Sequence, residues 1–220
     1  MKKILAGLAF LLAAVLTLDI GRYLVWPDVS RLKKEQPVKT SYMEFREKQW
    51  RRDGIPKRIV RRWVPLDGIS PYAVKAVIIA EDDKFWSHEG FDFEAIQKAV
   101  EKDLKSKKFK AGGSTISQQL ARNLYLSPSK NPLRKMKEAI LTWRLERNLT
   151  KRRIIELYLN VAEWGDGVFG IEAAANRYYG KGSAELTAHE AARLAVILPS
   201  PLRYRPGGGR SYPEKRAEVI

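Results

Sequence analysis

From Ser70 onward the chain is divided into segments that carry apolar residues at helical spacing and begin at residues suited to a helix start. These starting residues are Ser70 with Pro71, Asp92, Asn131 with Pro132, and Thr150. Residues 187–190 read TAHE, a capping box, and Gly180 is suited to end a helix. No alternating strand pattern of useful length follows Ser70. The sequence therefore predicts a mainly α fold, with at most a short hairpin near residues 40–66.

The chain begins with an uncharged apolar run, residues 4–18, that follows Lys2 and Lys3. The length of this run matches a signal-peptide core and is short of the ~20 residues that span a bilayer. However, no small-residue cleavage site follows, and apolar residues continue past Asp19 to Trp26, a residue type common at membrane interfaces. We therefore favour an uncleaved anchor over residues 1–26. The two lysines predict a cytoplasmic start, with the rest of the chain on the periplasmic side of the inner membrane.

Residues 27–69 are expected to form a basic connector between this anchor and a helical domain over residues 70–220. The connector contains Trp50 and Trp63 within Arg-rich clusters. Such a mixture fits a surface resting on anionic lipid headgroups with its indoles at the interface, and it fits a solvated basic linker equally well.

The chain as a whole carries 41 Lys and Arg against 25 Asp and Glu, a formal net charge of +16. This excess predicts an anionic partner, which leaves nucleic acid, anionic lipid or a phosphorylated substrate. There is no cysteine, so disulfides and thiolate metal sites are excluded. With only His88 and His189, a zinc site is disfavoured as well.

The segment EDDKFWSHEGFD, residues 81–92, gathers five acidic side chains in this basic protein. We expect the preceding helix to end near Glu81, after the aliphatic stretch AVIIA. Burial beside aliphatic side chains raises the pKa of a carboxyl group, as a general base working near neutral pH requires. The alternative is a charged surface turn in which Glu81 is a solvated helix-end acid.

The segment GGSTISQQLARN places Ser114 and Thr115 at an expected helix start, where free backbone N–H groups and the helix dipole favour an anion. Thr115, Gln119 and Arg122 follow one another at helical spacing, so a hydroxyl, an amide and a guanidinium could face one bound group. The alternative is a helix cap without a ligand.

The segment RKMKEAILTWRLE places Glu138 among three cations, Arg134, Lys135 and Lys137. Arg134 and Glu138 lie one turn apart, which also fits an ordinary ion pair on a helix surface. Together, however, the cations could hold a pyrophosphate while the carboxylate stays ionised.

Taken in order, these segments resemble the peptidoglycan glycosyltransferase family, the transglycosylase domain of class A penicillin-binding proteins, and most closely its monofunctional, membrane-anchored members. The family's first motif, EDxxFxxHxGFD, is matched at every fixed position. The second motif, GGSTITQQLxKN, differs at Ser117 and at Arg122, where lysine is usual. The third, RKxxEAxxAxxLE, differs at Thr142. Later segments, KRRIIELYLN, GIEAAANRYYGK and LTAHEAARLAVILPSPLRYRP, fit the remaining motifs.

The resemblance implies a lysozyme-like helical lobe beside a smaller membrane-facing lobe. It implies polymerisation of lipid II onto a growing glycan strand, with Glu81 as the base and Glu138 positioning the donor phosphates, either directly or through a divalent cation such as Mg²⁺ or Mn²⁺. The implied substrate-binding residues are Asp82, Phe85, His88, Ser114, Thr115, Gln118, Gln119, Arg122, Arg134 and Lys135. Implied partners are membrane lipid and cell-wall synthesis or division proteins.

Two rival readings stay open at this point. A lysozyme-like muramidase or lytic transglycosylase would cleave glycan with one protonated glutamate. A basic, membrane-attached nucleic-acid or scaffold protein would need no catalytic group, but the cations are spread among acidic residues and no nucleic-acid motif is recognisable, so we expect no nucleic-acid partner.

Overall fold

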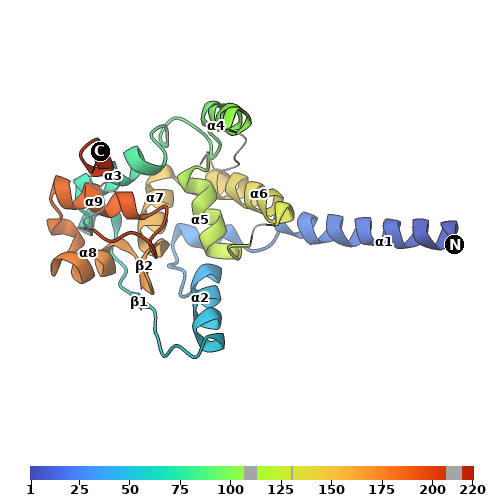
Figure 1. Ribbon diagram of the computed structural model, residues 1–220, viewed down its shortest axis with the longest axis horizontal. Helices are drawn as coiled ribbons and strands as arrows, with labels where there is room; N and C mark the ends of the chain where they lie inside the picture. The colour runs from blue at the N-terminus through green and yellow to red at the C-terminus, as the bar shows by residue number, and fades with distance from the viewer. Residues whose placement is uncertain (107–112, 130, 207–214) are drawn as a thin grey trace.

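The computed structural model describes residues 1–106, 113–129, 131–206 and 215–220 of the chain. Helix α1, Lys2–Gly21, projects from the rest of the molecule, with the N-terminus at its far end (Figure 1). Among the described residues, the helical stretch Lys2–Lys33 is long and apolar enough to cross a membrane, and none of its most apolar window is buried. This is the arrangement that an uncleaved anchor requires.

The segment after α1 is folded, and the predicted hairpin near residues 40–66 is wrong. Helix α2 occupies Ser41–Arg52, and only Val60–Arg61 form a strand, β1. Met43, Arg46 and Trp50 recur at helical spacing and are all buried, which explains the helix. Short 3-10 turns complete the segment at Arg22–Leu24, Val29–Lys33 and Leu66–Gly68.

Ion pairs and apolar contacts hold this connector against the helical domain. The buried Arg46 guanidinium pairs with Glu163 at 3.0 Å, across 117 positions of sequence. The indole of Trp50 is buried, and that of Trp63 packs against the core with Arg153 over its ring. The indole of Trp50 is therefore not free to lie at a lipid interface, whereas Trp26, next to α1, is 60% exposed.

The remaining elements confirm the mainly α, lysozyme-like fold. The helices are α3 (Pro71–Glu81), α4 (Phe93–Ser106), α5 (Ile116–Tyr125), α6 (Pro132–Asn148), α7 (Lys151–Val161), α8 (Ile171–Tyr179) and α9 (Ala188–Ile197), with a 3-10 turn at Ser183–Glu185. Strands β2 (Glu163–Gly165) and β3 (Val168–Phe169) form a hairpin, and β1 adds to it in parallel, giving the order β1-β3-β2.

Most of the expected helix starts are capped as their residue types suggest. The side chains of Asn131, Thr150 and Thr187 each accept a hydrogen bond from a first-turn backbone N–H, and Asp92 Oδ1 accepts one from Ala95. Ser70 differs, because its hydroxyl donates to the carbonyl of Leu186 at 2.8 Å and so ties α3 to the segment before α9. Gly180 ends α8 in the left-handed conformation, with φ of 67°.

The core lies mainly between the helices that follow α2, and Tyr23, Val29 and Leu32 pack into it from the segment before α2. Helix α5 packs against both α6 and α7, and α3 packs against α9 (Figure 1). Residues with no exposed surface come from each of these layers and include Leu120, Leu141, Leu157 and Leu194. This packing brings the end of α3, the start of α5 and the start of α6 to neighbouring places.

Candidate functional site

Glu81 is the last residue of α3, as the sequence predicted. One carboxylate oxygen, Oε2, accepts a hydrogen bond of 2.7 Å from the amide of Gln119. The other, Oε1, is buried and has no hydrogen-bond partner within the described part of the chain. Burial raises the pKa of Glu81, and the Gln119 hydrogen bond and the charges of Arg216 and Arg122 only partly oppose this. The structure therefore presents a buried carboxyl group with one oxygen hydrogen-bonded and the other unpaired.

Asp82 supports the turn that follows Glu81. One of its oxygens accepts the backbone N–H of Ile116 at 2.9 Å, and both lie within 3.0 Å of His88 Nε2. The Nδ1 atom of His88 accepts the backbone N–H of Gly90, so the ring proton lies on Nε2 and points to Asp82. Asp82 thus joins the end of α3 to the start of α5.

Gly90 fixes the position of the same turn against α6. Its φ is +91°, a region that favours glycine, and a Cβ there would lie 2.8 Å from Thr142 Cγ2 and 2.9 Å from Glu146 Cγ. Its carbonyl accepts the hydroxyl of Thr115 at 2.7 Å. A side chain at this position would push the acidic turn away from α6.

The start of α5 is a capping box between Thr115 and Gln118, each side chain pairing with the backbone of the other. Both residues are buried. Phe85 has no exposed surface, and its ring packs edge-to-face with that of His88. Phe85, Thr115 and Gln118, which the resemblance implies bind substrate, are thus buried side chains, and Thr115 lines a hollow together with Glu81.

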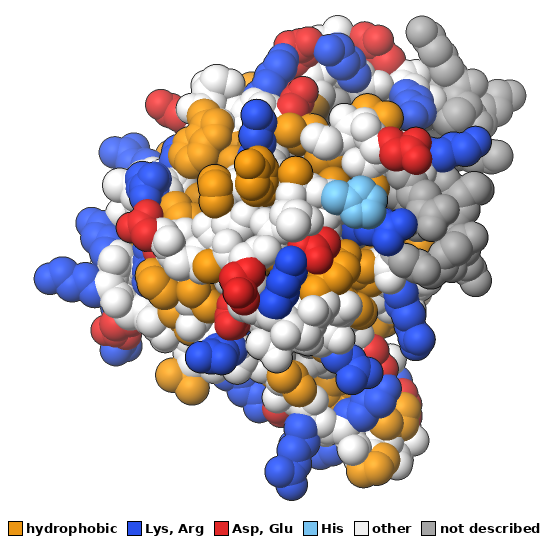
Figure 2. All heavy atoms as spheres, turned by 90° about the vertical axis from the view of Figure 1, so that its left-hand side faces the viewer, with side chains coloured by type: hydrophobic (Ala, Val, Ile, Leu, Met, Phe, Trp, Pro, Cys, Tyr) orange, Lys and Arg blue, Asp and Glu red, His pale blue; other side chains and the backbone are white. Residues whose placement is uncertain are grey.

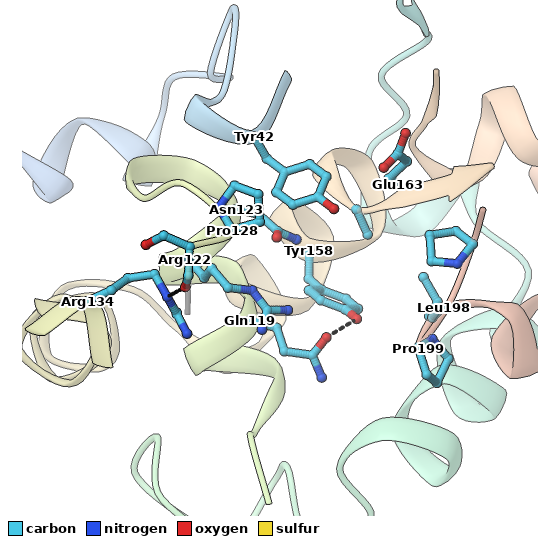
Figure 3. Close-up of a pocket in the computed structure, with 13 residues that line it drawn as sticks. Tyr42, Gln119, Arg122, Asn123, Pro128, Arg134, Tyr158, Glu163, Leu198 and Pro199 are labelled. Atoms are coloured by element: carbon cyan, nitrogen blue, oxygen red, sulfur yellow. Dashed lines mark hydrogen bonds between the residues drawn. The ribbon is translucent and has the colours of Figure 1, made fainter. Parts of the chain in front are cut away.

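Gln119 and Arg122 lie about one and two turns after Thr115 on α5, and both side chains line a hollow (Figure 3). The amide oxygen of Gln119 accepts the hydroxyl of Tyr158 from α7 at 2.9 Å. The charge of Arg122 acts on both Glu81 and Tyr158, where it opposes the rise in pKa that burial causes. The predicted hydroxyl, amide and guanidinium face of α5 therefore lies along two hollows: Thr115 lines one together with Glu81, and Gln119 and Arg122 line the other.

Glu138 on α6 is 1% exposed and pairs with two cations, Arg134 and Lys135. Lys135 also donates to the hydroxyl of Ser114 at 3.2 Å, which links the two predicted anion-binding segments. Arg134 Nε donates to the carbonyl of Ser129. The predicted ion pair is confirmed, but it is buried rather than superficial, so Glu138 sets the directions of the cations.

Two hollows lie near the hydrogen-bonded pair Gln119 and Glu81, and each is lined by one residue of the pair. The larger of the two, of about 280 Å³, is also lined by Arg122 and Arg134 (Figure 3). Its lining residues are Tyr42, Gln119, Arg122, Asn123, Pro128, Ser129, Arg134, Tyr158, Ala162, Glu163, Leu198, Pro199 and Pro201. The smaller, of about 190 Å³, is lined by residues that include Glu81, Asp82, Gly113 and Ser114. A buried carboxyl group therefore lies beside one hollow, and two arginines lie beside the other.

Comparison with known proteins agrees with this geometry. A family model described as Transglycosylase matches residues 49–220. The chain belongs to the transglycosylase family. The match begins inside α2, so this transglycosylase fold includes part of the segment that the sequence suggested was a connector.

Relatives of this transglycosylase share about half of its residues. A protein named biosynthetic peptidoglycan transglycosylase from Nitrosospira multiformis is 48% identical over 184 residues, 84% of this chain and 80% of the relative. Proteins of the same name are 54% identical in Aromatoleum aromaticum, over 76% of this chain and 73% of the relative, and 47% identical in Dechloromonas aromatica, over 93% and 86%.

Several residues of the transglycosylase site were not anticipated from the sequence. Tyr42 reaches the larger hollow from α2, and Tyr158 and Glu163 reach it from α7 and β2. Arg216, near the end of the chain, donates to the carbonyl of Ala80 beside Glu81. Of these residues, only Tyr158 could have been suspected from the sequence, because its hydroxyl lies among the apolar residues of an amphipathic helix. The positions of Tyr42, Glu163 and Arg216 depend on contacts between distant segments.

The resemblance raised a divalent cation at Glu138. Both oxygens of Glu138 pair with cations, Arg134 and Lys135. In the described ranges, no group of three or more acidic or histidine residues is arranged to hold a metal ion by itself.

Proposed function

We propose that this chain polymerises lipid II into glycan strands, with Glu81 as the base. Its membership of the transglycosylase family and the names of its relatives make it a glycosyltransferase of peptidoglycan synthesis. The observation that carries the assignment of roles is a buried carboxyl group with one unpaired oxygen near a hollow that is lined by two arginines.

The reaction needs a proton acceptor and a place for negative charge. The 4-hydroxyl of the acceptor GlcNAc attacks C1 of the MurNAc at the end of the growing chain, and its proton passes to Glu81. The bond from C1 to the pyrophosphate oxygen breaks, and undecaprenyl pyrophosphate leaves with the electron pair. Attack opposite the leaving group inverts the α anomer to β, so no covalent glycosyl-enzyme forms.

Arg122 and Arg134 suit the departure of the pyrophosphate. Both guanidinium groups line the larger hollow, and fixed cations stabilise the charge that develops on a phosphate oxygen. Lys135 on α6 donates a hydrogen bond to Ser114, which precedes α5, so this pair links the two predicted anion-binding segments. Arg122 in place of the family's usual lysine keeps the charge and replaces a point donor by a planar fork.

Hydrolysis of glycan is the second candidate, since a raised pKa also suits a carboxyl group that donates a proton. The cations favour transfer, because a sugar alcohol leaving group needs a proton donor and gains little from arginines, whereas a pyrophosphate leaves as an anion. On the face that Figure 2 shows, Lys and Arg side chains are spread among acidic and hydrophobic ones, with no continuous basic stripe for nucleic acid.

The test is incubation of the purified full-length protein with fluorescent lipid II in detergent. We expect long glycan that muramidase digests, and no soluble muropeptides from isolated sacculi. Release of muropeptides without polymerisation would favour the hydrolase. Repetition with EDTA and with added Mg²⁺ or Mn²⁺ measures any metal requirement; we expect less than about a twofold change, since the side chains supply the charge.

We further propose that α1 is a single-pass anchor of the inner membrane and that the catalytic domain lies on the periplasmic side. Lys2 and Lys3 before the apolar run support this orientation. The chain has no cysteine, so single cysteines report location directly. In spheroplasts, an impermeant maleimide should label the exposed Ala184→Cys at once and Lys3→Cys only after permeabilisation; the reverse pattern would invert the topology. Recruitment by cell-wall synthesis or division proteins stays a prediction from the resemblance.

A further inference from the structure

Three side chains from three helices form a hydrogen-bonded line that ends at Glu81. The hydroxyl of Tyr158 on α7 lies 2.9 Å from the amide oxygen of Gln119 on α5 (Figure 3). The amide nitrogen of Gln119 lies 2.7 Å from Glu81 Oε2 at the end of α3. Tyr158 is 1% exposed, so it meets Gln119 inside the protein rather than in solvent.

The chemistry of these groups permits one direction of donation when Glu81 is ionised. A carboxylate only accepts hydrogen bonds, so Gln119 must present its NH₂ group to Glu81. The oxygen of the amide then faces Tyr158, whose hydroxyl must donate to it. Burial raises the pKa of Tyr158 well above its ordinary value, so the phenol keeps its proton throughout the working pH range.

We infer that Tyr158 is a positioning residue that holds the Gln119 amide in the orientation that supports Glu81 as an ionised base. Without the hydroxyl, the amide oxygen of Gln119 loses its buried donor. The amide can then rotate and present its oxygen to Glu81, where two acceptors repel. The inference rests on the proposed role of Glu81 and deepens it: Oε2 is held by the line, and the unpaired Oε1 is the oxygen left to take the proton.

Other charged groups also act on Glu81, but none of them depends on the amide. Asp82 follows it on the same segment, Arg122 faces it from α5, and Arg216 faces it from the C-terminal segment. Asp83 and Asp92 line the adjoining hollow. Since these groups stay in place when one hydroxyl is removed, Tyr158→Phe isolates the effect of the hydrogen-bonded line.

The experiment compares pH profiles of kcat/KM for lipid II polymerisation in the full-length wild type and in Tyr158→Phe. We expect the acid limb to move up by about one pH unit, because a hydrogen bond to an ionised group is replaced by a weaker or repulsive contact. On the acid limb, where a shift of one pH unit means tenfold less ionised Glu81, kcat should fall about tenfold at a given pH with little change in KM. Tyr178→Phe is the matched control, since it removes another hydroxyl that donates inside the protein, to the carbonyl of Trp164.

A double-mutant cycle separates the line from general loosening of the fold. Gln119→Met should move the acid limb in the same direction, and Tyr158→Phe should add nothing to it in the double variant. An unmoved acid limb in a folded Tyr158→Phe protein, an equal shift in Tyr178→Phe, or additive shifts in the double variant would overturn the inference.

A direct titration distinguishes failure of this inference from failure of the proposed function. Carboxyl ¹³C NMR of labelled protein, with the Glu81 signal assigned by its loss in Glu81→Gln, measures the ionisation without any turnover. An upward shift in Tyr158→Phe supports the line even if the wild type fails to polymerise lipid II. An unchanged titration overturns the line even if the wild type polymerises normally.

Discussion

Glu81→Gln should lower the rate of lipid II polymerisation at least about 100-fold, because the acceptor hydroxyl then has no base for its proton. The glutamine keeps the shape of the side chain, so the measurement is of chemistry: product chain formation from labelled lipid II, at saturating substrate. In the wild type, the rate should fall as pH drops through the raised pKa of Glu81, since only the ionised form accepts a proton.

Stability provides the control for this variant. The folded-state pKa of Glu81 is raised, so its ionised form lowers the free energy of unfolding once pH exceeds the unfolded-state pKa. A neutral glutamine removes this cost, and the Tm of Glu81→Gln at neutral pH should equal or exceed that of the wild type. Glu89→Gln, at an exposed position of the same acidic segment that lines neither hollow, should retain full activity. Polymerisation by Glu81→Gln at the wild-type rate would remove Glu81 as the base.

Arg134→Ala should lower kcat by about 10²- to 10³-fold, because a fixed cation is lost from the hollow assigned to the pyrophosphate. This corresponds to about 3–4 kcal/mol of transition-state stabilisation. The variant also leaves the buried Glu138 with Lys135 as its remaining ion-pair partner, so a lower Tm is expected. Rates must therefore be compared at a temperature at which both proteins are folded, as monitored by circular dichroism.

Arg147→Ala is the matched control for the loss of charge. Arg147 lies in the last turn of the same helix, where its guanidinium packs over the exposed ring of Trp143, away from the hollow. Its removal should leave kcat within about twofold of the wild type, as expected for a surface substitution. Equal losses in the two variants would mean that net charge on α6, rather than a directed cation, supports the reaction.

The helices and their N-terminal caps could be predicted from the sequence because the interactions that form them are local. Thr150 and Asn131 lie within three residues of the N–H groups that they cap, and the helix that ends at Glu81 follows from a continuous aliphatic run. The uncharged run after Lys3 likewise contains all the information needed to predict an apolar helix. Neither conclusion required knowledge of where any other segment lies.

The fold of residues 27–69 was not readable in the same way. Charge and proline content suggested a linker, yet Arg46 is buried because Glu163 accepts its guanidinium, and Trp50 is buried with it. A buried arginine is stable only beside its counter-charge, and here that partner lies on a strand 117 positions away. Amino-acid composition does not show that Glu163 will lie beside Arg46 in the folded protein.

The sequence by itself determined the order of helices, the apolar anchor and the candidate base, because capping and hydrophobic spacing act over a few residues. Only the tertiary structure decided that Phe85 and Gln118 are enclosed, that Glu138 is buried between two cations, and that Tyr158 meets Gln119. Helical spacing shows which face of a helix is buried but not what it packs against. That depends on how α3, α5, α6 and α7 pack together, which no single segment specifies.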